Sequence, residues 1–183
     1  MNLNPELTPE QRKLLNHTVI KTVGEYSDAG FRIDKIENSR PWGGFVQLKS
    51  EDASKFAEYH FSEVKIPMEG KCYPKILIIL QDRRTSLQYH LNREEYWVGV
   101  DGEVRVHRAQ NDQVPTKYAF NINGRVLFVG RTCRHSIEGI APISRVAEIW
   151  HEPDPNNPTD EITDNYRVHD FYGRPNEGLV ISR

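Results

Sequence analysis

The sequence contains few cysteines and no long hydrophobic run. Two of its 183 residues are cysteine, Cys72 and Cys133, too few to form a disulfide framework or a zinc cluster by themselves. We expect both to be reduced, partly buried thiols. The longest apolar run, Ile76 to Leu80, is far too short to cross a bilayer, and no charged-then-apolar signal pattern opens the chain. These absences predict a cytoplasmic protein that does not bind membranes.

The sequence also lacks a surplus of charge of either sign. It has 24 Lys and Arg against 26 Asp and Glu, a formal net charge of -2, and the two signs are interspersed. Nucleic acid is therefore not an expected partner, although local arginines can still bind small anions. Hydrophobic residues make up 37% and charged residues 27%, which is typical of a globular protein with one domain.

One amphipathic helix is predicted near the start of the chain. In "TPEQRKLLNHTVIKTVGEYSDAG", Thr8 is the expected N-cap, Pro9 takes the first helical position and Gln11 completes a capping box. Apolar residues then recur at helical spacing: Leu15, Val19, Val23 and Tyr26. We expect this face to pack on the body of the protein or on a partner subunit rather than to bind a cofactor.

After Gly30 the pattern changes to short β-rich runs separated by Gly, Pro, Asn and Asp. The runs are "FRIDKIEN", "GFVQLKS", "AEYHFSEVKI", "KILIIL", "EYWVGV", "EVRVHRA", "RVLFV", "HSIEGI" and "SRVAEIW". Such a series predicts an all-β sandwich or barrel, and "VDGEV" predicts a two-residue hairpin. From His151 onward the chain is rich in proline and polar residues, so we expect a long loop and a C-terminal arm.

Metal-ligating residue types cluster in "TSLQYHLNREEYWVGVDG", residues 85 to 102. In a strand Gln88 and His90 point the same way, and the chain has room to turn and bring Glu95 back beside His90. Imidazole, carboxylate and amide oxygen suit a borderline divalent cation. A fourth ligand is missing, and His135 is the candidate because it follows a strand and tight turn. Glu94 competes with Glu95.

Two segments resemble the motifs of the cupin superfamily. "QYHLNREEYWVGVDG" resembles the first motif, with Gln88 and His90 in its two His places, Glu95 as the acid and Gly102 as the glycine. This spacing favours Glu95 over Glu94, which we expect to be solvated. "GRVLFVGRTCRHSIEG" resembles the second motif through His135. It departs from that motif at three positions, which are Gly130, Thr132 and Gly139.

Three further segments resemble the type II phosphomannose isomerase domain within the cupins. They are "RPWGGF", "RTSLQYHLNREEYW" and "DEITDNYRVHDFYGR", and that family also has Gln where most cupins have His. The resemblance implies an all-β cupin-type double-stranded β-helix, a jelly-roll barrel, with an N-terminal α-helix. It divides the chain into an N-terminal helical extension (1–37), the cupin β-barrel (38–175) and a C-terminal tail (176–183). Cupin barrels are commonly dimers, so a homodimer is expected.

The resemblance also assigns roles to individual residues. The proposed ligands of one divalent ion (Zn, Mn, Fe, Co or Ni) are Gln88, His90, Glu95 and His135. The proposed sugar or phosphate contacts are Arg40, Trp42, Arg84, Arg93, Arg167 and Arg174. Glu148 is the candidate base, with Lys75 and His151 as alternatives. Trp42 suits core packing equally well, and Trp97 is expected in the core.

Members of this family are metal-dependent isomerases that interconvert mannose 6-phosphate and fructose 6-phosphate through an enediolate. The resemblance thus implies a mannose-6-phosphate isomerase-like enzyme. Two departures, "LQDRR" before the first motif and an insertion in "EITDNYRVHD", lie in loops that would shape the sugar site. The alternatives are an isomerase of free sugars such as lyxose or mannose, and a non-catalytic sugar-binding cupin.

Overall fold

The computed structural model describes residues 3–110, 116–121, 125–154 and 164–174. The strands of these residues form two antiparallel sheets. The first has the order β1 (Ile33–Arg40), β2 (Gly43–Leu48), β3 (Lys71–Leu80), β10 (Ile143–Glu152), β5 (Glu94–Asp101) and β8 (Leu127–Val129). The second has the order β11 (Tyr166–His169), β4 (Leu87–Tyr89), β9 (Cys133–Gly139), β6 (Glu103–Gln110) and β7 (Thr116–Asn121).

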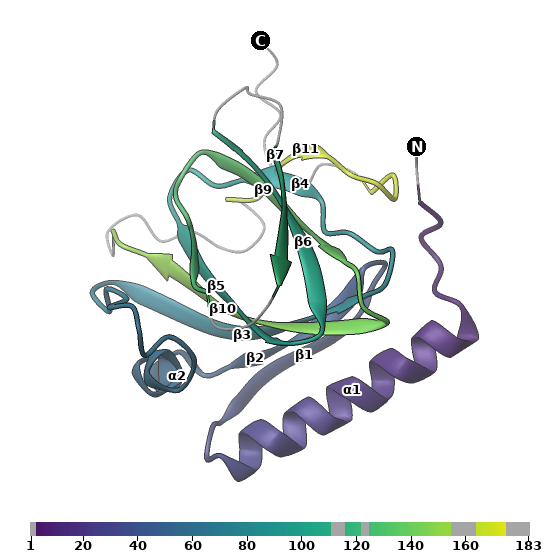
Figure 1. Ribbon diagram of the computed structural model, residues 1–183. Helices are drawn as coiled ribbons and strands as arrows, with labels where there is room; N and C mark the ends of the chain where they lie inside the picture. Colours follow the sequence, from purple (N-terminus) through teal and green to yellow (C-terminus); the bar gives the residue numbers. More distant parts are fainter. Residues whose placement is uncertain (1–2, 111–115, 122–124, 155–163, 175–183) are drawn as a thin grey trace.

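The strand order is that of a jelly roll. Strands β3, β10, β5 and β8 form one sheet and β4, β9, β6 and β7 the other, so the first strand pairs with the last and the second with the last but one. The two sheets curve around a common interior (Figure 1). The expected all-β, cupin-type jelly roll with an N-terminal helix is therefore confirmed.

Strand β3 is apolar along most of its length because both of its faces are buried. Ile76, Ile78 and Leu80 pack outward against a cluster that includes the helices, whereas Leu77 and Ile79 belong to the cluster inside the barrel. Alternating side chains on one strand thus serve two separate cores. This arrangement explains the run "KILIIL", which would otherwise alternate with polar residues.

Helix α1 (Pro9–Asp28) begins with the expected capping box, in which Thr8 and Gln11 each accept the other's backbone N–H. It runs along the outside of β1 and β2 (Figure 1). Leu15 and Val19 are buried in the outer core, so the apolar face packs on the barrel. Neither helix in the described residues is long and apolar enough to cross a membrane.

One predicted strand is wrong. Residues 57–66, expected as a strand from "AEYHFSEVKI", begin within helix α2 (Ala53–His60), which follows the short 3-10 helix η1 (Ser50–Asp52). Phe56 is fully buried in the outer core and Tyr59 lies 62% exposed, the contrast expected of a helix docked by one face. The residues around Phe56 favour a helix by their intrinsic propensity, and burial of Phe56 stabilises the helix over a strand.

The expected boundaries also differ in detail. The division drawn after residue 37 falls inside β1, which pairs with β2 along its length. Strand β11 lies in the region expected to be a loop and pairs with β4. The tail expected at residues 176–183 lies outside the described residues. The hairpin at Gly102 is present, and its φ of 77° requires glycine there.

If α1 packs on the barrel, substitutions at its buried and exposed positions should change the free energy of unfolding by different amounts. Leu15→Ala removes a side chain with no exposed surface and should lower the free energy of unfolding by about 2–5 kcal/mol. Ile20→Ala, on the same helix but 72% exposed, should change it by less than about 0.5 kcal/mol. Urea denaturation of both variants measures the difference. Equal, small effects would show that α1 does not pack on the barrel in solution.

Candidate metal centre and its cavity

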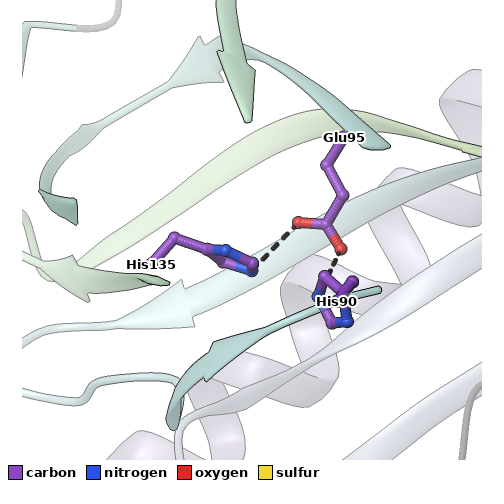
Figure 2. A group of neighbouring side chains, drawn as sticks. All are labelled: His90, Glu95 and His135. Carbon is purple, nitrogen blue, oxygen red and sulfur yellow. Dashed lines mark ion pairs between the residues drawn. The ribbon is translucent and has the colours of Figure 1, made fainter. Parts of the chain in front are cut away.

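Three buried side chains converge inside one end of the barrel. His90 directly follows β4, Glu95 is the second residue of β5 and His135 lies on β9 (Figure 2). His90 Nε2 lies 3.1 Å from Glu95 Oε1, and His135 Nε2 lies 3.3 Å from Glu95 Oε2. One ligand atom from each of the three lies within 4.8 Å of the others, so the group could hold a metal ion.

The outer nitrogen of each imidazole is tied to a backbone carbonyl. His90 Nδ1 lies 2.6 Å from the Asp164 oxygen, and His135 Nδ1 lies 2.8 Å from the Cys133 oxygen. A carbonyl oxygen only accepts hydrogen bonds, so each Nδ1 must carry a proton. In a neutral ring the lone pair is then on Nε2, which faces Glu95. This is the orientation that metal-binding histidines adopt.

The charges of the group favour a cation between these atoms. Burial, with help from the Arg93 guanidinium, lowers the pKa of His90 to about 4, so the ring is neutral at neutral pH. Burial opposes ionisation of Glu95, and only positive charge beside it, on imidazolium rings or on a cation in their place, holds its pKa well below the usual range. A neutral His90 therefore turns its lone pair toward an ionised carboxylate. Two acceptors so close repel each other unless a cation binds both.

The donor set passes a simple test of fit. Buried Glu95 Oε2 and His135 Nε2 have no hydrogen-bond partner among the described residues. Ligands about 2.1 Å from an ion are about 3.0–3.4 Å apart in octahedral or tetrahedral geometry, which brackets the separations here. Two imidazoles and a carboxylate suit Zn, Mn, Fe, Co or Ni. The residues present thus fit a divalent ion.

Gln88 lies beside this group. It is the register partner of His135 across β4 and β9 and lines the same cavity. Its Oε1 accepts a hydrogen bond from Ser86 Oγ at 2.8 Å, which orients the amide. A carbonyl oxygen has two lone pairs, so Oε1 keeps one for another partner.

A neighbouring segment fixes the position of His90. The backbone carbonyl of Asp164 accepts from His90, while the Asp164 carboxylate accepts from the backbone N–H groups of Leu91 and Asn92 at 2.9 and 3.2 Å. One residue thus holds both the ring and the turn that follows it. Sequence reasoning missed Asp164, since it lies in the segment whose insertion obscures the family pattern.

The group opens onto a cavity of about 450 Å³. Among the described residues, its wall carries six basic and two acidic side chains, so an anionic ligand is favoured. The basic residues are Lys35, Arg40, Lys75, Arg93, Arg167 and Arg174, and the acidic ones are Glu95 and Glu148. The other end of the barrel is filled by apolar residues, including Ile79, Val104, Val106 and Val146. The fold thus confines polar chemistry to one end.

Glu148 lies on the cavity wall opposite Lys75 on β3 and Trp97 on β5. Trp97 Nε1–H donates to its Oε1 at 2.9 Å. Burial, and secondly the charge of Glu95, raise the pKa of Glu148 to about 7, against the opposing effect of Lys75. Glu148 can therefore gain and lose a proton near neutral pH.

Lys75 is held by aromatic rings as well as by its place in the sheet. It is 4% exposed, and its Nζ lies 5.1 Å from the centre of the Phe45 ring and 4.7 Å from that of Trp150. Cation–π contacts of this kind hold an ammonium group in place against a partly apolar wall. The charge therefore stays directed at the cavity.

The structure does not place Arg84 at the cavity. Its guanidinium donates to Ser136 Oγ at 2.7 and 2.9 Å and stacks on the Phe171 ring at 4.4 Å. Arg83 is directed elsewhere too, donating to the backbone carbonyls of Asn4 and Glu6. Neither arginine is thus available to a ligand of the cavity.

The remaining substrate-binding candidates all line the cavity: Arg40, Trp42, Arg93, Arg167 and Arg174. Arg40 and Arg174 are oriented by acids at 3.7 and 2.6 Å, namely Glu37 and Asp170. Trp42 is part of the inner apolar cluster and also lines the cavity wall.

The other acid and histidine candidates lie outside the group. Glu94 is only partly exposed and lies 3.7 Å from both Arg131 and His151. His151 Nε2 lies 2.7 Å from the Glu69 carbonyl oxygen, so the ring is held away from the cavity. The cavity also includes residues that sequence reasoning missed, among them Lys35, Ser86, Trp150 and Asn165. Lys35 and Trp150 had a signal, because each lies on a predicted strand.

If His90, Glu95 and His135 bind a metal ion, variants that lack one of these ligands should lose the ion. Protein purified without chelator should carry about one divalent ion per chain, and His90→Ala or His135→Ala should weaken its binding at least about tenfold by removing a ligand. His169→Ala, an exposed histidine on β11, should retain the metal. Elemental analysis after dialysis measures each content. Wild-type protein that holds no stoichiometric ion and cannot be reloaded would contradict the assignment.

No family model matches the sequence, and no curated protein matches it. Among solved structures, the chain is similar to the capsular polysaccharide assembling protein CapF from Staphylococcus aureus, with 17% identity, a TM-score of 0.48, and 76% of this chain and 33% of that chain covered. It is also similar to oxalate decarboxylase from Bacillus subtilis, with 14% identity, a TM-score of 0.49, and coverage of 65% and 28%.

The chain thus spans about a third of the length of these two proteins. At such identities their activities do not transfer to it. The description of the chain as a cupin-type jelly roll follows from its own strand order.

Proposed function

We propose that this chain is a metal-dependent aldose–ketose isomerase of sugar phosphates, similar to mannose-6-phosphate isomerase and acting through an enediolate. One observation carries the proposal. The buried group of His90, Glu95 and His135 opens onto a cavity that also holds a carboxyl group with a pKa of about 7 and an excess of basic side chains. A Lewis-acid site, a base and an anion-binding wall are what such an isomerase requires.

In this proposal His90, Glu95 and His135 hold the ion, with Gln88 as the fourth ligand. A bound divalent ion supplies polarisation of the sugar carbonyl. The buried carboxylate and two neutral imidazoles leave such a centre a net charge of about +1, which favours developing negative charge on oxygen.

Glu148 is the proposed base. Its carboxylate takes the proton from the carbon beside the carbonyl and returns it to the neighbouring carbon, with the enediolate between the two transfers. A pKa near the working pH suits both halves of this transfer. Lys75, opposite Glu148 in register, contributes a fixed positive charge that favours the enediolate.

The phosphate is assigned to the remaining basic residues of the cavity. Arg40, Arg167 and Arg174 present guanidinium groups, which bind phosphate oxygens through paired hydrogen bonds, and Lys35 adds a further charge. Arg84 is left out of this set, because it is bound to Ser136. Holding the phosphate places the reactive carbons of the sugar beside Glu148.

Two alternatives share the cavity. An isomerase of free sugars such as lyxose or mannose would use the same ligands and base, but it would leave the excess positive charge of the cavity without a role. A non-catalytic sugar-binding cupin would leave the raised pKa of Glu148 without one. Both features therefore favour the sugar-phosphate reaction.

Parallel assays on phosphorylated and free sugars test the proposal. Metal-loaded protein should interconvert mannose 6-phosphate and fructose 6-phosphate with a kcat/KM at least about a hundredfold higher than for mannose or lyxose, since charged hydrogen bonds to phosphate are lost with the free sugar. Activity on free sugars alone would establish the first alternative. Saturable sugar binding without turnover in fully metallated protein would establish the second.

The proposed role of Glu148 as the base predicts that kcat depends on pH and that substitution of Trp97 shifts this dependence. Glu148→Gln should lower kcat by about 10²–10⁴-fold while metal content is kept. In the wild type kcat should fall as pH drops through the pKa of Glu148, because the base must be ionised. Trp97→Phe removes the N–H that favours the carboxylate, so this acid limb should move to higher pH. A pH profile unchanged in both variants would exclude Glu148 as the base.

A further inference from the structure

Arg93 occupies an unusual place beside the candidate metal ligands. Its side chain is 4% exposed, its Nη2 lies 3.2 Å from His90 Nε2, and its Nε lies 3.4 Å from Glu95 Oε1. The guanidinium also stacks over Trp150, with Cζ 3.9 Å from the ring centre. A fixed positive charge therefore touches two of the three residues that would bind a cation.

The contact with His90 and a bound metal are mutually exclusive. Because His90 Nδ1 donates its proton to the Asp164 carbonyl, Nε2 offers a single lone pair. That lone pair can accept the N–H of Arg93 or bind a cation, but not both. A guanidinium this close would also repel a divalent ion in a buried site, where screening by water is weak. Metal binding must therefore release Arg93 from His90.

The cavity offers Arg93 a second position. Arg93 lines the cavity wall, and its Nη1 has no hydrogen-bond partner among the described residues. Trp150 can keep the planar guanidinium stacked while it turns. An oxyanion such as a phosphate ester in the cavity would give the released group charged hydrogen bonds.

We propose that Arg93 couples the two ligands of the site: bound oxyanion draws the guanidinium away from His90 and Glu95, and thereby raises the affinity for the metal. By linkage, bound metal must raise the affinity for the oxyanion by the same factor. Arg93 is then a positioning residue that makes the complete site assemble with its anionic ligand. This inference rests on the metal centre of the proposed function and adds how that centre is regulated.

Cobalt(II) titrations test the coupling without any assay of activity. Co²⁺ binding is followed by its visible absorption, with and without sulfate as an oxyanion that leaves cobalt in solution. Sulfate should tighten cobalt binding to the wild type. Arg93→Met keeps the packing on Trp150 but removes the charge, so it should bind cobalt about tenfold more tightly without sulfate and show no response to sulfate.

Two further variants control the result. Arg84→Met removes a guanidinium that lies outside the cavity, on Ser136 and Phe171, so it should change cobalt affinity less than about twofold in the absence of sulfate. Arg93→Lys keeps the charge but loses the planar fork, so it should tighten cobalt binding less than Arg93→Met. Arg93→Lys replaces Arg93→Met as the test variant if circular dichroism shows that Arg93→Met is unfolded.

The outcomes separate this inference from the proposed function. Cobalt affinity in Arg93→Met that equals or falls below that of the wild type would overturn the coupling and leave the metal centre standing. The coupling would also be overturned if Arg84→Met tightened cobalt binding as much as Arg93→Met does. Wild-type protein that binds no cobalt under either condition would overturn both.

Discussion

The structure depends on one buried carboxylate. Glu95 lies between two imidazoles whose outer nitrogens are tied to backbone carbonyls, so both rings turn their inner nitrogens toward it. Burying such a group is costly, and the barrel accepts this cost at one end. Two polar residues of the cavity respond to that charge: Arg93 neutralises it, and, second to burial, it raises the pKa of Glu148.

The jelly roll is suited to this arrangement because alternate residues of each strand face the interior. On β5, Glu95 and Trp97 both point inward, as Leu77 and Ile79 do on β3. Polar residues at one end of each strand and apolar residues at the other separate the reactive cavity from the core. Helices α1 and α2 cover the outer face of the first sheet, so the sheet is supported where its inner face carries charge.

The sequence predicted the features that depend on local period and spacing. An all-β sandwich or barrel and the capping box of α1 follow from such patterns, whereas the jelly roll and the proximity of His90, Glu95 and His135 were expected from the resemblance to the cupin motifs. Tertiary contacts decided the rest. Residues 57–60, expected at the start of a strand, belong to α2, which docks through Phe56, and Arg84 turns to Ser136 although its place before β4 suggested the cavity. Asp164 holds His90 mainly through its backbone, which leaves no sequence signal.

The central claim is that His90, Glu95 and His135 form a metal centre. Crystals of the wild-type protein grown with Mn²⁺ or Zn²⁺, measured on both sides of the absorption edge of the metal, test it most directly. The account predicts one anomalous peak bonded to both Nε2 atoms and to the Glu95 carboxylate, with Arg93 turned away from His90. A peak elsewhere, or a fully loaded crystal without one at this position, would contradict it.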